Sequence, residues 1–259
     1  MKISIITTCH NSSKTIEDTI NSVLSQDYDN IEYIIIDGNS KDDTHKIIAK
    51  YKNKISQIVS EPDEGIYDAM NKGIKLTTGH IVGFLNSDDL YASKSTISQV
   101  ANSMQQNDYE AVYGDLLYVD KKDINKIVRY WQAGNYIKGA FRTGWVIPHP
   151  TFFCLKILFD KFGYFNEKFQ IAADFELMLR FVEKHQIKVG YIPQIIVKMR
   201  RGGKANVLRG MIRGNLEIIR SFGLNNLKLS PLFFIHKPIT KISQLFLRPN
   251  ETIFHSTDF

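Results

Sequence analysis

Short apolar runs alternate along the first half of the chain with segments in which apolar residues recur every three or four positions. The runs predict buried strands at residues 3–8, 31–36, 55–60 and 81–85. The helical spacing predicts a helix that begins near residue 16 behind a Thr15 and Asp18 capping box, and helices at 42–50 and 66–76. Repeated strand and helix pairs of this kind predict a mostly parallel α/β sheet with helices on both faces.

The pattern becomes less regular beyond the middle of the chain. The remaining predicted elements are a helix at 94–107, a strand at 111–119, a helix at 174–184 and a strand at 190–197. Residues 121–150 show no clear period, but they contain Trp131, Tyr136, Phe141 and Trp145. Such rings can form a sugar platform or a lid, although the general burial preference of aromatic side chains favours core packing.

The composition is that of an ordinary globular protein. The chain has 259 residues, of which 43% are hydrophobic and 23% are charged, and this excludes disordered, collagen-like and disulfide-dense classes. Its two cysteines, Cys9 and Cys154, show no metal-binding or disulfide spacing. No apolar run approaches the ~20 residues that span a bilayer, and the first strand is too short for a secretory signal. A reducing, cytoplasmic setting is expected.

Positive charge is concentrated near the C-terminus. Residues 1–197 carry 22 basic and 24 acidic residues, whereas residues 198–248 carry 11 basic residues and a single acid, Glu217. Beyond residue 203 the sequence predicts one or two basic helices, broken by Pro231 and Pro238. The net charge of +6 is therefore a property of a C-terminal helical extension.

This basic extension can be a solvated helix face, a nucleic-acid-binding patch or a membrane-surface anchor. Its basic and apolar residues recur together at helical spacing, as shown by Arg209, Arg213 and Arg220 beside Leu208, Ile212, Leu216 and Ile219. Contact with the anionic inner face of the cytoplasmic membrane is the interpretation we favour. Packing of the same stripe against the catalytic domain or a second subunit is nearly as well supported, and a nucleic-acid partner is not expected.

Polar residues follow the predicted parallel strands at the edge where such sheets bind ligands. Thr8 ends the first strand, Asp37 ends the second, and Asp88 and Asp89 follow the fourth. Two adjacent carboxylates repel each other unless a cation or a basic group lies between them. Glycine-rich phosphate loops are missing from the sequence, so Mg²⁺ or Mn²⁺ shared with a nucleotide diphosphate is the expected ligand.

An ordered set of motifs over residues 2–205 resembles the inverting family 2 glycosyltransferases of the GT-A fold, especially their bacterial polysaccharide and lipopolysaccharide branch. The motifs are Ile3 to Thr8 with Asn11, Ile35 to Gly38, Gly65 to Gly73, Phe84 to Asp89, His149-Pro150, Gly163 with Phe165, and Ala172 to Asp174 leading to Arg180. The resemblance implies a GT-A domain at 1–203, with a nucleotide-binding half at 1–115 and an acceptor-binding half at 116–203. A basic amphipathic tail at 204–259 would follow it.

The resemblance also implies roles for the residues of the donor site. Asp37 would accept a hydrogen bond from uracil, and His10 would lie against the ring. Asn86-Ser87-Asp88 matches the Asp-x-Asp motif with Asn86 in place of the first acid, so Asp88, helped by Asp89, would hold Mn²⁺ or Mg²⁺. The residues expected around the nucleotide are Thr8, His10, Asn11, Asp37, Asp68, Asn71, Asn86 and Ser87.

On the acceptor side, Asp174 matches the catalytic base of the family and His149 matches a histidine that contacts the acceptor or a phosphate. The implied reaction moves a hexose or N-acetylhexosamine from a UDP-sugar to a glycan or lipid-linked acceptor with inversion, in bacterial cell-envelope polysaccharide assembly. The enzyme would be cytoplasmic or peripheral on the inner face of the membrane, and it could form a homo-oligomer.

Other interpretations remain open. Asp37 can begin an ordinary turn, Asp88 and Asp89 can be solvated or cap a helix, and Asp174 can cap the helix it precedes. His149 can be an ordinary loop histidine. A metal-dependent sugar nucleotidyltransferase would need a basic loop near the first strand, where Lys14 is alone. A non-catalytic module that binds glycans or nucleic acid through the basic tail is the alternative outside enzymes.

Overall fold

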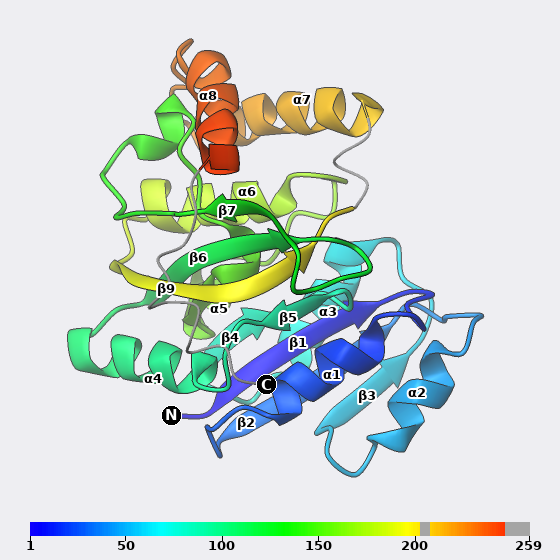
Figure 1. The fold of residues 1–259 in the computed structure, drawn as a ribbon. Coiled ribbons are helices and arrows are strands. Elements are labelled where there is room, and N and C mark those ends of the chain that lie inside the picture. Colours follow the sequence, from blue (N-terminus) through cyan, green and yellow to red (C-terminus); the bar gives the residue numbers. More distant parts are fainter. Residues whose placement is uncertain (203–207, 247–259) are drawn as a thin grey trace.

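A computed structural model describes residues 1–202 and 208–246 of the chain (Figure 1). The strands are β1 (Ile3–Cys9), β2 (Ile31–Asp37), β3 (Gln57–Ser60), β4 (Ile81–Phe84), β5 (Asp89–Tyr91), β6 (Ala111–Val119), β7 (Ile127–Trp131), β8 (Phe153–Leu155) and β9 (Val189–Arg200). The α-helices are α1 (Ile16–Leu24), α2 (Thr44–Lys50), α3 (Ile66–Leu76), α4 (Thr96–Asn107), α5 (Ile157–Phe162), α6 (Ala173–Met178), α7 (Leu208–Leu224) and α8 (Phe233–Phe246). Short turns of other helix types are η1 (Ala140–Thr143), η2 (His149–Thr151) and η3 (Leu179–Lys184).

The strands form one sheet in the order β3-β2-β1-β4-β8-β6-β9-β5, with β7 paired to β6. Pairing is parallel from β3 through β4 and again between β6 and β9, as the sequence predicts. The pairs made by β8, β5 and β7 are antiparallel. The ends of β1, β2 and β4, where Thr8, Asp37 and Asp88 lie, therefore all belong to the parallel half of the sheet. The second half contains both parallel and antiparallel pairs.

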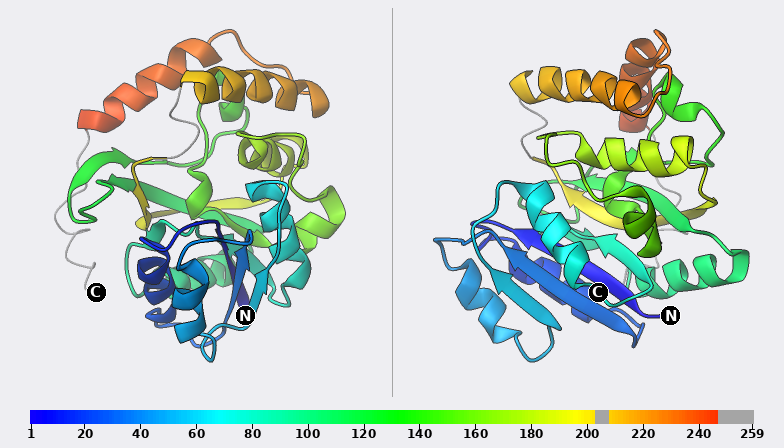
Figure 2. Two further views of the ribbon diagram at one scale, coloured as in Figure 1. Left: turned by 90° about the vertical axis from the view of Figure 1, so that its right-hand side faces the viewer. Right: turned by 180° about the vertical axis from the view of Figure 1, so that it is seen from behind.

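Helices cover both faces of the sheet (Figures 1 and 2). Along β2, Tyr33 and Ile35 belong to one core cluster with residues of α1, α2 and α4, while Ile34 and Ile36 belong to the other with residues of α3, α5 and α6. Successive side chains of a strand point to opposite faces, so a continuous apolar run in a strand predicts burial on both. The two-sided α/β layering predicted from the sequence is confirmed.

Some local elements differ from the sequence prediction. Strands β5, β7 and β8 and helix α5 were not predicted, whereas the helix expected at 174–184 is present, as α6 followed by the π-helical turn η3. The predicted capping box is absent: the Thr15 hydroxyl donates to the Ser12 carbonyl at 3.5 Å, and the Asp18 carboxylate pairs with Arg200 at 2.5 Å. The aromatic residues do pack in the core as favoured: the Trp145 ring centroid lies 5.5 Å from that of Phe141.

The C-terminal helices α7 and α8 lie over α6, on the outer side of the second half of the sheet (Figures 1 and 2). Pro231 lies between them, but Pro238 lies within α8 and does not end it, contrary to the sequence prediction. Ile218, Phe222 and Phe233 are buried in the same core cluster as α6. In the part of the chain that the structure describes, no helix is long and apolar enough to cross a membrane.

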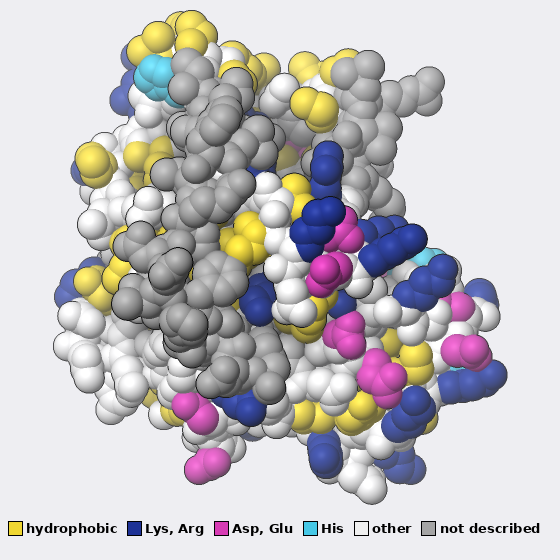
Figure 3. Space-filling view, viewed as in Figure 1, with side chains coloured by type: hydrophobic (Ala, Val, Ile, Leu, Met, Phe, Trp, Pro, Cys, Tyr) yellow, Lys and Arg dark blue, Asp and Glu magenta, His cyan; other side chains and the backbone are white. Residues whose placement is uncertain are grey.

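The predicted apolar stripe of α7 faces away from the domain. Ile212 is 57% exposed, Leu216 61% and Ile219 46%, whereas the domain packs against a different face that carries Ile218 and Phe222. The side chains of Leu208 and Arg209 lie outside the described residues. Hydrophobic side chains accordingly show at the top of the molecule, where α7 and α8 lie (Figure 3). Among the described residues of the stripe, Ile212, Leu216 and Ile219 therefore do not pack on their own domain.

Candidate active site

The loops after β1, β2 and β4 meet at the carboxyl edge of the parallel strands. The backbone N–H of Gly38 donates to the carbonyl of Cys9 at 2.8 Å, and His10 Nδ1 lies 2.8 Å from the Gly38 carbonyl oxygen. The hydroxyls of Ser12 and Ser87 are 2.8 Å apart. Three segments that the sequence predicted for one nucleotide site are therefore joined, with the side chain of His10 exposed.

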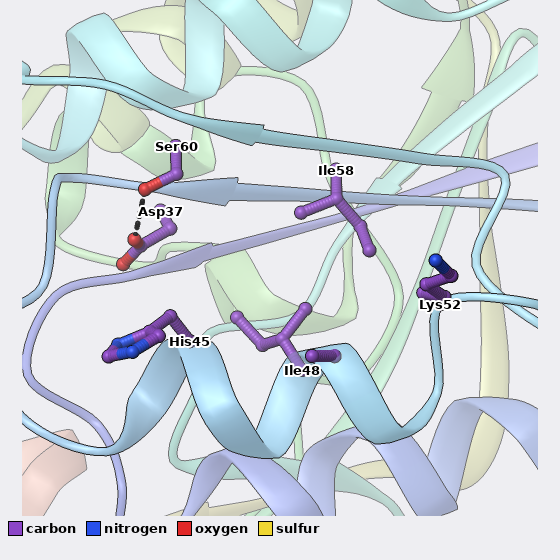
Figure 4. Close-up of a pocket in the computed structure, with 7 residues that line it drawn as sticks. Asp37, His45, Ile48, Lys52, Ile58 and Ser60 are labelled. Atoms are coloured by element: carbon purple, nitrogen blue, oxygen red, sulfur yellow. Dashed lines mark hydrogen bonds between the residues drawn. The ribbon is translucent and has the colours of Figure 1, made fainter.

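Asp37 holds this edge together through its own carboxylate. The side chain is 1% exposed and accepts a hydrogen bond from the Ser40 hydroxyl at 2.5 Å. It accepts another from the Ser60 hydroxyl at 2.6 Å (Figure 4). It also forms one wall of a pocket of about 190 Å³ between α2 and β3. Its oxygens are engaged inside the fold, and the bond to uracil stays a prediction.

Asn11 and Asn39 give the loops after β1 and β2 their sharp change of direction. Both residues have left-handed backbone conformations, with φ of 51° and 58°. Asparagine tolerates this conformation better than most residues. The side-chain carbonyl of Asn11 accepts from the backbone N–H of Lys41 at 2.8 Å. The backbone N–H of Asn11 donates to the Ser40 hydroxyl at 2.8 Å. Asn11 therefore joins the two loops beside His10, which gives it a structural role at the predicted nucleotide site.

Asp88 lies in the loop between β4 and β5, and Arg200 holds that loop from beneath. Arg200 is 5% exposed and donates through Nη1 to the Asp88 carbonyl at 2.8 Å and through Nη2 to Asp18. The Asp88 carboxylate is half-buried; this burial raises its pKa, and the positive charges of Arg200 and Lys121 oppose the shift. Sequence reasoning missed Arg200, although it stands at the end of a strand inside the basic segment.

Asn86 belongs to the same loop, and Asp89 is the first residue of β5, directly after it. Asp89 is fully buried, and burial together with the neighbouring charge of Asp88 raises the pKa of Asp89 well above its usual range. Its carboxylate accepts one long hydrogen bond, 3.4 Å, from the Asn86 amide. The remaining side-chain oxygens of the two residues, Asn86 Oδ1 and Asp89 Oδ1, are buried and have no hydrogen-bond partner.

Asp174 is the second residue of α6, and two side chains from distant elements contact it. His149 Nδ1 lies 3.1 Å from Asp174 Oδ2, and the Tyr67 hydroxyl donates to Oδ1 at 3.4 Å. Burial and the negative charge of Asp174 raise the pKa of Tyr67, so its hydroxyl stays a donor. The Asp174 side chain is 24% exposed, and it is therefore accessible to a small molecule.

Tyr118 lies within electrostatic reach of both Asp89 and Asp174. This tyrosine on β6 has a pKa raised by burial and by the negative charges of both Asp89 and Asp174, against the opposing charge of Arg129. Charges act on a group in this way only over short distances. Asp89 and Asp174 therefore both lie near the Tyr118 hydroxyl, and the convergence of Asp88 and Asp174 on one site stays a prediction.

The remaining predicted residues occupy more structural positions. Thr8 is 7% exposed at the end of β1. The Asp68 carboxylate accepts from the Glu64 N–H at 3.0 Å and pairs with Lys72 at 3.1 Å. Asn71 is buried, donates to the Phe165 carbonyl at 3.0 Å and accepts from the N–H of the same residue. The polar groups of Asn71 are thus used within the fold, and its nucleotide contact stays a prediction.

The oxygen-bearing side chains around Asp88 suit a hard divalent cation. Among the described residues, no group of three or more His, Cys, Asp and Glu side chains is arranged to hold a metal alone. Asp88 offers a half-buried carboxylate, and the two buried oxygens without partners lie in the same loop. Mg²⁺ and Mn²⁺ prefer oxygen ligands and commonly take only one or two carboxylates from the protein.

Comparison with known sequences gives a consistent family. The sequence model described as glycosyl transferase family 2 matches residues 4–164. An uncharacterized glycosyltransferase of Mycobacterium tuberculosis is 31% identical over 186 residues, which cover 69% of this chain and 68% of that protein. A PGL/p-HBAD biosynthesis glycosyltransferase of Mycobacterium bovis is 26% identical over 210 residues, which cover 79% of each chain.

Solved structures share the fold at lower identity. Staphylococcus aureus TarS 1–349 in complex with UDP-GlcNAc has a TM-score of 0.68 and 19% identity, over 95% of this chain and 72% of that chain. The mannosyltransferase PcManGT of Pyrobaculum calidifontis, in complex with GDP-Man and Mn²⁺, has a TM-score of 0.65 and 17% identity, over 99% and 72%. The architecture is therefore that of GT-A enzymes, and the family match over most of the chain places this protein among the family 2 glycosyltransferases.

Proposed function

We propose that this glycosyltransferase moves a hexose or N-acetylhexosamine from a UDP-sugar to a glycan or lipid-linked acceptor, with inversion at the anomeric carbon. The observation that carries the proposal is the partly exposed Asp174 carboxylate, which is contacted on one oxygen by His149 and on the other by Tyr67. Inversion by direct displacement needs a base on one face of the sugar and stabilisation of negative charge on the other.

In the proposed reaction, Asp174 removes the proton from an acceptor hydroxyl while that oxygen bonds to the anomeric carbon. The bond between this carbon and the diphosphate oxygen breaks, and UDP leaves with the bonding electrons. His149 holds Asp174 Oδ2 and Tyr67 holds Oδ1, so the carboxylate is oriented before the acceptor arrives. Orientation of this kind lowers the entropic cost of the transition state.

Asp88, with help from Asp89 and Asn86, would hold Mn²⁺ or Mg²⁺ at the diphosphate. Such a cation, when bound, neutralises the negative charge that develops on the leaving group. Because Asp89 is fully buried, we assign direct contact to Asp88 and place Asp89 beneath it. In this proposal, residues 1–115 bind the nucleotide through the loops around His10 and Asp37, and residues 116–203 bind the acceptor.

Two relatives support the choice of a UDP-sugar and of envelope glycans. TarS was solved with UDP-GlcNAc, and the mycobacterial relative is named for PGL/p-HBAD biosynthesis. PcManGT binds GDP-Man on the same fold, so the donor panel must include guanosine derivatives. We propose bacterial cell-envelope polysaccharide assembly as the setting.

The exposed stripe of α7 supports a peripheral position on the inner face of the cytoplasmic membrane. Ile212, Leu216 and Ile219 are exposed on α7, which also carries Arg213 and Arg220 on its exposed surface. Apolar residues interspersed with arginine suit an interface that contains anionic lipid. Pairing of two copies through the same stripe is the competing arrangement, and it would give a homo-oligomer.

The function is tested by incubating the full chain with Mn²⁺ and UDP-GlcNAc, UDP-Glc, UDP-Gal or GDP-Man, with and without bacterial lipid extract. We expect release of UDP from one uridine donor, stimulated by the extract and abolished by Asp174→Asn. Release of GDP alone would overturn the choice of donor. Formation of nucleotide sugar from UTP and a sugar phosphate, without any transfer, would favour the nucleotidyltransferase alternative.

A further inference from the structure

The single acid in the basic C-terminal segment points into the protein. Glu217 lies on α7 and is 6% exposed, whereas Arg213, one turn earlier, is exposed and donates to it at 3.2 Å. A carboxylate is costly to bury unless its oxygens accept hydrogen bonds. The hydrogen-bond partners of the Glu217 carboxylate therefore indicate its structural role.

Three consecutive backbone N–H groups donate to the Glu217 carboxylate. Gln170 donates to Oε1 at 3.0 Å, and Ile171 and Ala172 donate to Oε2 at 2.9 Å each. Ala172 is the residue immediately before α6, and Asp174 is the second residue of that helix. Burial opposes ionisation of Glu217, but the three N–H groups and Arg213 outweigh it, so the pKa of Glu217 is lowered.

Helix α7 also contacts the residue after Asp174. The Phe175 ring packs against Phe222 of α7 with centroids 6.0 Å apart, and against Phe233 of α8 at 6.3 Å. Gly214 lets α7 approach the loop closely, because a Cβ at this position would lie 3.2 Å from the side chain of Ile171. The C-terminal helices thus hold the backbone on both sides of Asp174.

We infer that Glu217 is a positioning residue for the catalytic base, acting through the three amides that precede α6. The inference rests on the proposed function, and it makes α7 part of the catalytic unit. Without the Glu217 carboxylate, the three N–H groups, of which that of Ala172 is buried, would lose their acceptor and the loop would move to find others. Small displacements of a catalytic group cost large factors in rate, up to about 100-fold for 1 Å.

The first test is Glu217→Gln, which keeps the side-chain shape but leaves only one accepting oxygen. We expect kcat to fall by roughly 10- to 100-fold, while KM for the donor and the Kd of UDP stay within twofold, because the Glu217 carboxylate accepts its hydrogen bonds from residues 170–172 and Arg213. Hydrogen exchange of the amides of residues 170–172 should become faster. Glu32→Gln is the matched control, because Glu32 is equally buried and accepts from Ser4 and Thr78 at the opposite end of the parallel strands.

The second test is Gly214→Ala, which keeps the inference testable if Glu217→Gln simply unfolds. Alanine favours the helical conformation over glycine, so Tm should not fall, but its Cβ would press on Ile171 and move the loop. A lower kcat at an unchanged or higher Tm supports positioning. The inference is overturned if both variants keep wild-type kcat, if Glu32→Gln lowers kcat as much as Glu217→Gln, or if exchange at 170–172 is unchanged in Glu217→Gln.

The outcome separates this inference from the proposed function. If the wild-type chain transfers no sugar from any donor, the proposed function fails, and the role of Glu217 in catalysis fails with it. The exchange rates of residues 170–172 would then still decide whether Glu217 holds the loop. If the wild type is active and both variants match it, the inference alone is overturned.

Discussion

His149 Nδ1 lies 3.1 Å from Asp174 Oδ2, although the two residues belong to separate short helical turns joined by β8 and α5. Pro150, in the turn that starts at His149, has a fixed φ and restricts the backbone there. Asp174 is fixed on the other side by the start of α6. The pair therefore has the geometry of a base and the group that orients it.

Asp174→Asn should preserve UDP binding and remove transfer. The amide keeps the shape of the carboxylate but cannot take the acceptor proton, so the rate should fall by the ~10²–10⁴-fold that general base catalysis supplies. Calorimetry with UDP and a coupled assay of UDP release measure the two quantities. Full activity in this variant would remove Asp174 from the role of base.

His149→Gln should lower kcat less than the loss of the base. The glutamine side chain can still donate to Asp174 but cannot reproduce the position of a rigid ring. A hydrogen bond to a charged group contributes about 1.5–3 kcal/mol, so kcat should fall by roughly 10- to 100-fold in His149→Ala, which loses that bond. The fall in kcat should be smaller in His149→Gln, which can keep it. Steady-state kinetics on the wild type and the two variants measures kcat. Equal kcat values for all three would show that His149 does not orient Asp174.

Asp88→Ala should weaken UDP binding only when Mn²⁺ is present. Removal of the carboxylate takes away the proposed cation ligand, while the nucleotide loops around His10 keep their bonds. Asp29→Ala is the control, because Asp29 is an exposed acid just before β2, at the opposite end of the parallel strands. Titration calorimetry of UDP with and without Mn²⁺ measures the effect, and an unchanged dependence on Mn²⁺ would place the cation elsewhere.

The parallel half of the fold was predictable because local and global signals agree there. Residues such as Ile34 and Ile35 are apolar on both faces of a strand that is buried on both faces. The three-residue strands β5 and β8 were missed, since they are too short for any period and form only by pairing with β9, β4 and β6. Their positions depend on the rest of the sheet.

For the candidate site, the sequence predicted the acids and His149, but not the other residues that hold the acids. Tyr67 and Arg200 reach Asp174 and the Asp88 loop from elements far away in the chain, and sequence spacing carries no signal for such contacts. Glu217 did leave a signal, as the single acid among 11 basic residues. Asp37 was identified from the family motif, but its burial and its bonds to serine hydroxyls required the folded structure.

Replacing the exposed stripe of α7 should reduce binding to anionic vesicles. At about 1 kcal/mol for each partly buried side chain, the combined change of Ile212, Leu216 and Ile219 to Ser should weaken binding by about 100-fold. Cosedimentation with vesicles containing phosphatidylglycerol measures it, and Ile157→Ser, which changes an exposed isoleucine on α5, is the control. Equal binding by all variants, together with a concentration-dependent dimer of the wild type alone, would favour pairing of two copies.

Acid should destabilise the protein partly through Glu32. This carboxylate accepts hydrogen bonds from Lys2, Ser4 and Thr78; burial opposes these contacts, yet the net effect lowers the pKa of Glu32 from 4.5 to about 2. A lowered pKa in the folded state stabilises that state above pH 4.5, and the contribution is lost as the pH falls from there through 2. The shift corresponds to stabilisation on the order of 3 kcal/mol at neutral pH. Urea unfolding of wild type and Glu32→Gln from pH 7 downward should show a difference in free energy that shrinks below pH 4.5, whereas Asp29→Asn should track the wild type. A difference that stays constant with pH would show that the lost stability comes from packing and not from ionisation of Glu32.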